Sequence, residues 1–230
     1  MHALIILAVL VAAYLVGSLS FAVIISRVMG LADPRSYGSK NPGATNVLRS
    51  GNKAAALLTL AFDALKGYLP VLAVLIVGPR YGLDETTAAF AGLAAFVGHL
   101  WPVFFHFRGG KGVATAAGVL MAVNPGLALC AMLSFAVMLA FFRYVSLASI
   151  VAALFAPFYQ ALIWGMEPSI LAITAMSLLL IWRHEGNIRK LLAGTEGKLG
   201  QEPIAHALAP LQRMPHPHGH PPTKHKKGRR

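Results

Sequence analysis

The stretch GVATAAGVLMAVNPGLALCAMLSFAVMLAFF, residues 112–142, contains no Asp, Glu, Lys or Arg and decides the architecture. One helix of this length exceeds a bilayer's need, because a residue adds about 1.5 Å and the hydrocarbon layer is about 30 Å thick. The turn signal Asn124-Pro125-Gly126 divides it. We therefore expect a half-length helix over 112–123, tolerated where its backbone faces a cavity, and then a full span.

Five other long apolar segments surround this stretch. The chain of 230 residues is 57% hydrophobic and 12% charged, with a mean hydropathy of +0.64, so lipid must be the solvent for most of it. We predict an all-α polytopic membrane protein with seven transmembrane helices, the first retained rather than cleaved as a signal peptide. The other expected spans are Ala3–Ser26, Ala54–Val77, Thr86–Phe107, Val145–Met166 and Pro168–Trp182.

The distribution of basic residues predicts the orientation. With the N-terminus outside and seven crossings, 18 of the 20 Lys and Arg residues fall on one side. Because cytoplasmic loops are enriched in Lys and Arg, that side is expected to be cytoplasmic and to include the C-terminus. Topology also accounts for the net charge of +12, so we expect no nucleic-acid partner. We divide the chain into a membrane domain, 1–202, and a disordered basic His- and Pro-rich tail, 203–230.

Three polar clusters interrupt the apolar chain, all on the expected cytoplasmic side. The first, 38–49, offers two cations: Arg49 for paired hydrogen bonds to a phosphate and Lys40 for a point charge. Its hydroxyls and amides suit a polyol, although an ordinary basic loop is an equally good explanation of this cluster alone. The polar side chains are those of Ser39, Asn41, Thr45 and Asn46, with Gly43 among them.

The second cluster, 98–115, contains Arg108-Gly109-Gly110-Lys111-Gly112 immediately before the expected half-length helix. Glycines allow backbone N–H groups to approach an anion, and the positive end of a helix favours one. We therefore expect a phosphate site here that includes Thr115; it is not a Walker A loop, because the GxxxxGK[ST] spacing is absent.

The third cluster, 183–198, places His184 and Asn187 three residues apart, on one face of a helical end. His184 is a candidate to hydrogen-bond an alcohol or an oxyanion, or to act as general base. Glu185 and Glu196 are expected to orient the loops through ion pairs rather than take part in chemistry.

Ionisable residues also lie inside the expected spans. Asp63 and Lys66, at i and i+3, can pair on one helix face, and a structural pair is as plausible as a substrate contact. His99 is assigned a supporting or structural role. The lone cysteine, Cys130, is best explained as a small apolar residue.

Four stretches carry a family resemblance: GSKNPGATNVLR at 38–49, FDALKG at 62–67, GHLWPVFFHFRGGKGVAT at 98–115 and RHEGNIRKLLAGTEGK at 183–198. They resemble the acyl-phosphate:glycerol-3-phosphate acyltransferase family of bacterial inner membranes, the PlsY family, over about residues 5–200. The resemblance implies a seven-helix enzyme that transfers a fatty acyl group from acyl phosphate to the sn-1 hydroxyl of glycerol 3-phosphate, the first acylation of phospholipid synthesis.

The resemblance also implies residue roles. Ser39 and Arg49 would serve glycerol 3-phosphate binding and catalysis, with Thr45 and Asn46 lining the same pocket. Gly109, Gly110, Lys111 and Gly112 would hold the donor phosphate, His184 and Asn187 would hold and polarise the reacting groups, and Glu196 would be structural.

Acyl phosphate already contains a good leaving group, so positioning and charge suffice, and we expect no cofactor and no metal. The attacking hydroxyl's proton would go either to His184 or to the donor's own phosphate. The expected partners are the two substrates, the bilayer and an enzyme that produces acyl phosphate. The main alternative is a transporter of a phosphorylated solute, because broken helices also build transporter sites; the polar clusters, however, lie at the membrane surface and not at its midplane.

Overall fold

The computed structural model describes residues 1–200, so the expectations for the 203–230 tail lie outside the described residues. Its regular elements are helices, as predicted. The α-helices are α1 (His2–Gly17), α2 (Phe21–Val28), α3 (Ala44–Leu48), α4 (Lys53–Val77), α5 (Glu85–Leu100), α6 (Val113–Val123), α7 (Pro125–Phe142), α8 (Val145–Tyr159), α9 (Ser169–Arg183) and α10 (Glu185–Leu192). Short 3-10 turns occupy Gly78–Tyr81 and Val103–Phe105, and a π-helical turn occupies Gln160–Trp164.

Within residues 1–200, four helical segments are long and apolar enough to cross a membrane, and the bent pair α1–α2 makes five. The helices α6 and α9 are apolar but shorter. Length and composition therefore support a polytopic membrane protein, while the count of seven crossings stays a prediction. The four segments are Lys53–Tyr81, Glu85–Phe105, Pro125–Phe142 and Val145–Trp164.

The prediction of one continuous first span over Ala3–Ser26 was wrong. The chain breaks between α1 and α2, and the two helices meet at a bend of 41°. At the break, Lys66 Nζ of α4 donates a hydrogen bond to the Leu19 carbonyl at 2.7 Å. A side chain that satisfies a backbone carbonyl allows a helix to break in an apolar setting, and this partner lies 47 residues away in sequence.

The third expected span, Thr86–Phe107, ends as an α-helix seven residues early, at Leu100. Pro102 disfavours helical backbone at the residue before it, and Trp101 has φ −131° and ψ 71°. His106 and Phe107 then adopt positive φ values, and the chain folds back so that Gly109 lies against the carbonyl groups of His99 and Leu100 at the end of α5. The first polar cluster, 38–49, likewise contains a short helix that was not predicted, α3.

The division of residues 112–142 was predicted correctly. The helix α6 has 11 residues and α7 has 18. Asn124 ends the first and caps the second, because its side-chain oxygen accepts the Leu127 N–H at 3.1 Å, and Pro125 occupies the first turn of α7.

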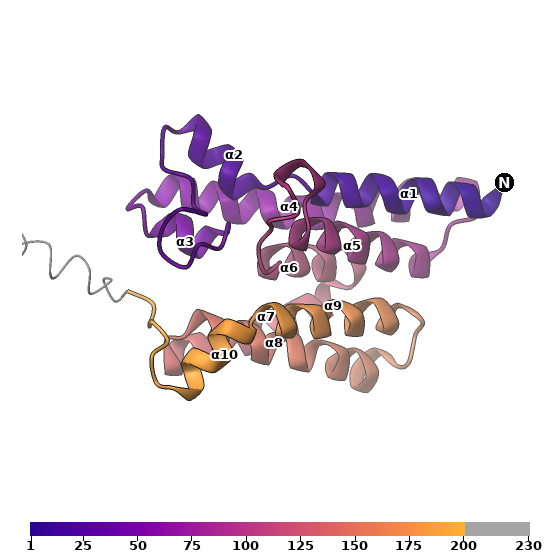
Figure 1. Cartoon of the computed structure of the whole chain (residues 1–230). Helices are drawn as coiled ribbons and strands as arrows, with labels where there is room; N and C mark the ends of the chain where they lie inside the picture. Colours follow the sequence, from indigo (N-terminus) through magenta and orange to yellow (C-terminus); the bar gives the residue numbers. More distant parts are fainter. Residues whose placement is uncertain (201–230) are drawn as a thin grey trace, which may run out of the picture.

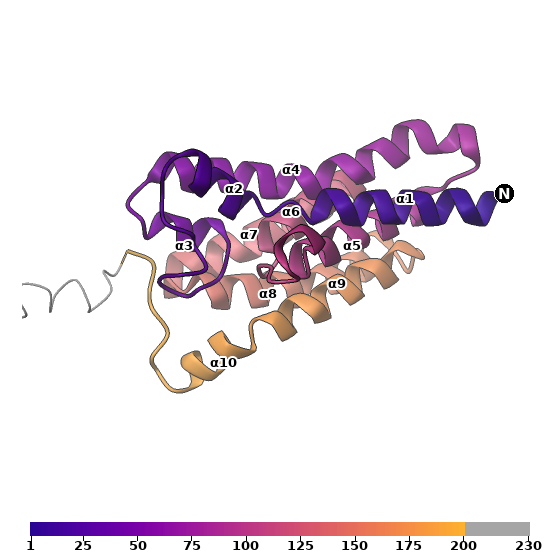
Figure 2. The ribbon, with the colours of Figure 1, turned by 45° about the horizontal axis from the view of Figure 1, so that its top comes forward.

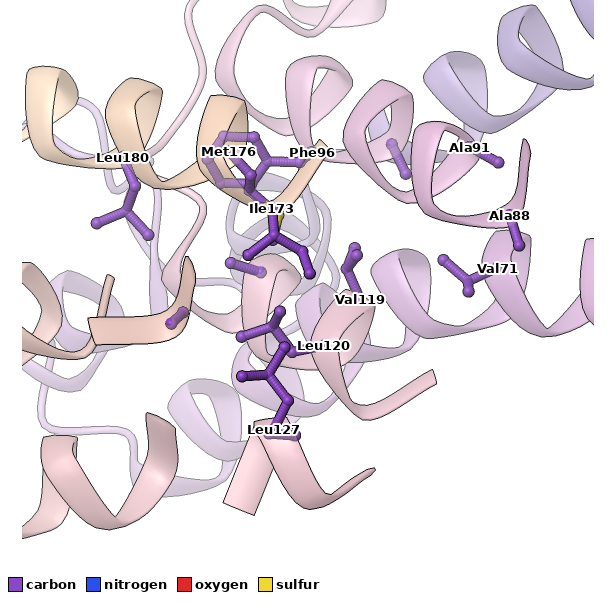
Figure 3. Close-up of a cluster of buried hydrophobic side chains, with 14 of the residues drawn as sticks. Val71, Ala88, Ala91, Phe96, Val119, Leu120, Leu127, Ile173, Met176 and Leu180 are labelled. Atoms are coloured by element: carbon purple, nitrogen blue, oxygen red, sulfur yellow. The ribbon is translucent and has the colours of Figure 1, made fainter. Parts of the chain in front are cut away.

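The core lies where α5, α6 and α9 meet (Figure 3). Phe96 and Leu100 of α5 are fully buried and share one cluster with Val119 of α6 and Ile173 of α9. Small residues bring α4 and α6 close: a Cβ on Gly67 would overlap the Thr115 carbonyl, and one on Gly118 would overlap Ala64. Such close approach is typical of packing between membrane helices.

The polar clusters and the N-terminus lie at opposite ends of the bundle. Figures 1 and 2 show α3 and α10 at one end and the N-terminus at the other. The turn that carries Arg80 lies at the N-terminal end, where His2 Nε2 is 3.2 Å from the Gly82 carbonyl oxygen. The α3 and α10 end therefore brings together the first and third polar clusters.

Candidate active site

The first polar cluster is a loop organised by one buried amide. Asn46, at 2% exposure, donates from Nδ2 to the Pro34 carbonyl at 2.6 Å and to the Tyr37 carbonyl at 3.2 Å. Its Oδ1 accepts the Ser39 N–H at 3.0 Å. The Asn46 side chain is therefore occupied in holding the loop, so we assign it to supporting the pocket rather than to substrate contact.

This scaffold leaves polar groups exposed beside a glycine. Ser39, Thr45 and Arg49 are exposed, and Asn41 is half-buried. The Arg49 side chain lies over Gly38, where an added Cβ would be 3.1 Å from Arg49 Cδ and 3.2 Å from Nη1. Gly43 is the extended N-cap residue directly before α3. The cluster thus presents hydroxyls and a guanidinium together.

The first cluster contacts the second directly. A Cβ on Gly110 would lie 2.9 Å from the Pro42 carbonyl oxygen, and it would also overlap the His99 ring. Only glycine fits between these two groups, so Gly110 lets the loop of Ser39 meet the loop of Lys111.

Arg183, at the end of α9, holds the Gly109–Gly110 backbone. Its Nη2 donates to the Gly109 and Gly110 carbonyls at 3.1 Å each, and its Nε donates to the Gly110 carbonyl at 3.2 Å. On the other side, the Gly110 N–H donates to the His99 carbonyl at 3.2 Å. Sequence reasoning gave Arg183 no role; its place directly before His184 was the available signal.

Beyond this anchored segment, a row of backbone donors is free. Among residues 1–200, the N–H groups of residues 111–114 have no hydrogen-bond acceptor. Gly112 takes φ +82° against the ring of Phe96, which turns the chain into α6. The positive end of α6 and the Lys111 ammonium therefore belong to one site.

The third cluster meets the second at Lys111. Lys111 Nζ donates to Asn187 Oδ1, and Asn187 Nδ2 donates to Glu196 Oε1 at 2.6 Å. The same Glu196 oxygen accepts the Ser146 hydroxyl at 2.6 Å. Glu196 thus holds the Asn187 side chain by a hydrogen bond, while the structural role expected of Glu196 stays a prediction. Ser146 is a further contact of this site that sequence reasoning missed.

Burial lowers the pKa of Lys111 to about 8. The carboxylate of Glu196 opposes this shift, whereas the positive charges of Lys190, Arg183 and Arg49 reinforce it. Because these charges act on one ammonium group, the three clusters share one electrostatic environment in which cations outnumber acids. A phosphate entering it would stabilise the charged form of Lys111.

Burial also lowers the pKa of His184, to about 4, and the positive charge of Lys111 contributes. Its Nδ1 lies 2.8 Å from the Leu180 carbonyl oxygen, which only accepts hydrogen bonds, so Nδ1 carries the proton. A neutral His184 therefore has an unprotonated Nε2 at pH 7. This nitrogen is the one able to accept a proton from an alcohol.

A second ionic cluster lies inside the bundle. Lys66 Nζ is 2.7 Å from Asp63 Oδ1, and His99 Nδ1 is 3.7 Å from the same oxygen. Thr115, which is fully buried, places its hydroxyl 3.2 Å from His99 Nδ1. Asp63, Lys66 and His99 therefore form an internal network, and Thr115 belongs to it here, so we do not propose that Thr115 touches substrate.

Glu185 is exposed and pairs with Arg189 on α10, away from the Lys111 contacts. Within residues 1–200, no three His, Cys, Asp or Glu side chains form a group able to hold a metal ion. The expectation that no metal or cofactor is required stays a prediction.

Known proteins resemble the chain over nearly all of this structure. The family described as Glycerol-3-phosphate acyltransferase matches residues 7–194. A glycerol-3-phosphate acyltransferase from Paraburkholderia phytofirmans is 59% identical over 203 residues, covering 88% of this chain and 95% of the relative. Its counterpart in Ralstonia nicotianae is 58% identical over 192 residues, covering 84% and 93%.

Two solved structures share the fold. One is PlsY (YgiH), an integral membrane glycerol 3-phosphate acyltransferase, in its glycerol 3-phosphate form; it is 39% identical, with a TM-score of 0.79, covering 89% of this chain and 98% of that one. Its lysophosphatidic acid form gives a TM-score of 0.77 and covers 85% and 95%. Together with the family match, these similarities show that the chain belongs to the glycerol-3-phosphate acyltransferase family, the PlsY family.

Proposed function

We propose that the protein transfers an acyl group from acyl phosphate to the sn-1 hydroxyl of glycerol 3-phosphate, giving 1-acyl-glycerol 3-phosphate and inorganic phosphate. The observation that carries this proposal is the junction at Lys111, where an ammonium group and free backbone N–H groups face a site rich in cations. Two phosphorylated reactants repel each other in water, and such a site offsets their repulsion.

In this proposal the donor phosphate binds at Lys111 and the N–H groups of residues 111–114. Gly109, Gly110 and Gly112 shape the loop that presents these donors. Glycerol 3-phosphate binds across the first cluster, with Arg49 on its phosphate and Ser39, Asn41 and Thr45 near its hydroxyls. The contact between Pro42 and Gly110 brings the two binding regions together.

The reaction then needs one bond made and one broken. The sn-1 hydroxyl oxygen attacks the acyl carbonyl carbon, and the bond from that carbon to the phosphate oxygen breaks. The hydroxyl proton passes either to Nε2 of His184 or to the departing phosphate. Asn187, fixed by Glu196, keeps the Lys111 ammonium at the donor phosphate while charge develops there.

The membrane arrangement is part of the proposal. We place the α3 and α10 end at the cytoplasmic face of the bacterial inner membrane, with seven crossings and the N-terminus outside. Supporting this placement, Arg49, Lys111 and α10 belong to that end, whereas Arg80 belongs to the N-terminal end. Membrane proteins concentrate Lys and Arg on the cytoplasmic side.

The test uses the purified full-length protein in detergent, with palmitoyl phosphate and glycerol 3-phosphate but without CoA or added metal. We expect equal amounts of phosphate and 1-acyl-glycerol 3-phosphate. We expect the same yield when EDTA is added to remove trace metal. Absence of product under these conditions, with product from palmitoyl-CoA instead, would contradict the proposed donor. Flux of a phosphorylated solute into proteoliposomes, without acyl transfer, would favour a transporter.

A further inference from the structure

Arg183 makes three hydrogen bonds to the Gly109–Gly110 backbone and lies next to His184, yet the proposed chemistry gives it no part. Its guanidinium reaches only backbone carbonyl oxygens in these contacts. A fork of charged donors aimed at two successive carbonyls fixes the orientation of the two peptide groups to which they belong.

The orientation of those peptides decides what the site presents. In a trans peptide, the C=O and the following N–H point in opposite directions. Fixing the Gly109 carbonyl fixes the Gly110 N–H, which is directed to the His99 carbonyl. Fixing the Gly110 carbonyl at Arg183 likewise turns the Lys111 N–H to the opposite side, and this N–H has no acceptor among residues 1–200.

The two peptides are held to different degrees. The Gly109–Gly110 peptide is held at both its carbonyl and its N–H, so His99 can maintain it without Arg183. The Gly110–Lys111 peptide is held at its carbonyl by Arg183. Because glycine permits most backbone angles, this peptide would be able to rotate and turn a carbonyl oxygen towards an incoming anion.

We propose that Arg183 is a positioning residue for donor selection: by holding the Gly110 carbonyl, it directs the Lys111 N–H towards the phosphate of acyl phosphate. This inference rests on the proposed function. In its hydrogen bonds Arg183 touches neither the Ser39 loop nor Arg49, so we expect the binding of glycerol 3-phosphate to depend on it much less than the binding of the donor. Loss of Arg183 should therefore weaken one substrate and spare the other.

The experiment measures KM for palmitoyl phosphate and for glycerol 3-phosphate separately in the full chain. For Arg183→Gln we expect KM for palmitoyl phosphate to rise about tenfold or more, with KM for glycerol 3-phosphate unchanged within about twofold. Arg183→Lys keeps the charge but lacks the fork, so it should show a smaller rise in the same KM. Inhibition by inorganic phosphate, which shares the donor site, should weaken in parallel.

A charge effect is separated from a positioning effect by the pH profile. Arg183 is one of the cations that lower the pKa of Lys111. Arg183→Gln should therefore move the alkaline limb of the activity to higher pH, whereas Arg183→Lys should leave it in place while still raising KM for the donor. The matched control is Arg189→Gln, which removes an exposed guanidinium paired with Glu185 and should leave both KM values unchanged.

Equal rises in both KM values, or a fall in kcat that merely follows the melting temperature, would overturn the assignment, and so would unchanged kinetics. If Arg183→Gln does not fold, Arg183→Lys decides the question: KM should rise for palmitoyl phosphate and not for glycerol 3-phosphate. Failure of the wild-type protein to use palmitoyl phosphate is a different result, because it contradicts the proposed function before any variant is compared.

Discussion

Two ionic clusters lie within the same helix bundle and differ in how their charges are matched. Inside the bundle, one ammonium group faces one carboxylate, and His99 and a backbone carbonyl complete their contacts. At the α3 and α10 end, three cations, Arg49, Arg183 and Lys190, act on the Lys111 ammonium group, and one acid, Glu196, opposes them. Matched charges stabilise structure, whereas surplus positive charge suits an anion, so we propose that the Asp63, Lys66 and His99 network stabilises the bundle and that the site around Lys111 binds substrate.

The largest effect is expected from unbalancing the internal cluster. Asp63→Leu leaves the ammonium of Lys66 buried without its carboxylate, and breaking such a pair typically costs about 3–5 kcal/mol. Thermal unfolding in detergent should show a large fall in melting temperature. The double variant Asp63→Leu/Lys66→Met removes both charges and should recover most of it; a double variant as unstable as the single one would contradict the pairing argument.

Removing Lys111, the central cation of the proposed substrate site, should lower the catalytic rate rather than the stability. Lys111→Ala deletes the ammonium proposed to hold the donor phosphate, so we expect kcat/KM to fall about 10²–10³-fold with little change in melting temperature. Lys53→Ala, at the exposed start of α4, is the matched control and should be nearly silent. Equal activities in the two variants would show that the surplus charge is not the binding site.

The pH dependence sharpens the same contrast. With a pKa of about 8, Lys111 is charged below pH 8 and loses its proton above it, so kcat/KM should fall about tenfold per pH unit on the alkaline side. With a pKa of about 4, His184 stays neutral from pH 5 upwards, so it should add no limb between pH 5 and 7; the change expected in that range is the second ionisation of the substrate phosphate, with a pKa of about 6. In Lys111→Arg the charge persists and the alkaline limb should disappear; a limb that stays at pH 8 would assign it to another group.

The smallest effect is expected at a charge pair that belongs to neither cluster. Glu185 and Arg189 are exposed and one helical turn apart on α10. Exposed pairs of this kind contribute at most about 0.5 kcal/mol, so Glu185→Gln should change neither melting temperature nor kcat/KM measurably. A clear loss of activity would mean that α10 contributes more to the site than its contacts with Lys111 indicate.

Sequence patterns predicted the features that depend on local chemistry. The division at Asn124-Pro125, the long helix α4 and the apolar helices of the second half were predicted correctly, because turn residues and charge-free runs act on their own neighbourhoods. The break after Gly17 was missed, because its stabilising partner, Lys66, is distant in sequence. Nothing in an apolar stretch of 24 residues reveals that another helix supplies the hydrogen bond.

The candidate site was predictable to a similar degree. Glycines, cations and the histidine pointed to Lys111 and His184, and the structure brings their loops together. What the sequence did not reveal was the division of labour among polar residues. Asn46 and Thr115 are consumed by internal contacts, while Ser146 and Arg183 take part in the site, because hydrogen-bond partners are decided by folding and not by residue type.

The shortness of α6 affects where the acyl chain of the donor lies during the reaction. It turns back into α7 at Asn124 but has 11 residues against 18, so its first turn is recessed by about 10 Å from the end of its neighbour. In the proposed membrane placement, the start of α6, and Lys111 directly before it, therefore lie deeper than the end of α7. Lifting an acyl tail into water costs about 0.8 kcal/mol for each methylene. Because the anion site lies at this level, the acyl tail need not leave the hydrocarbon, and the donor reacts while its tail stays in the leaflet.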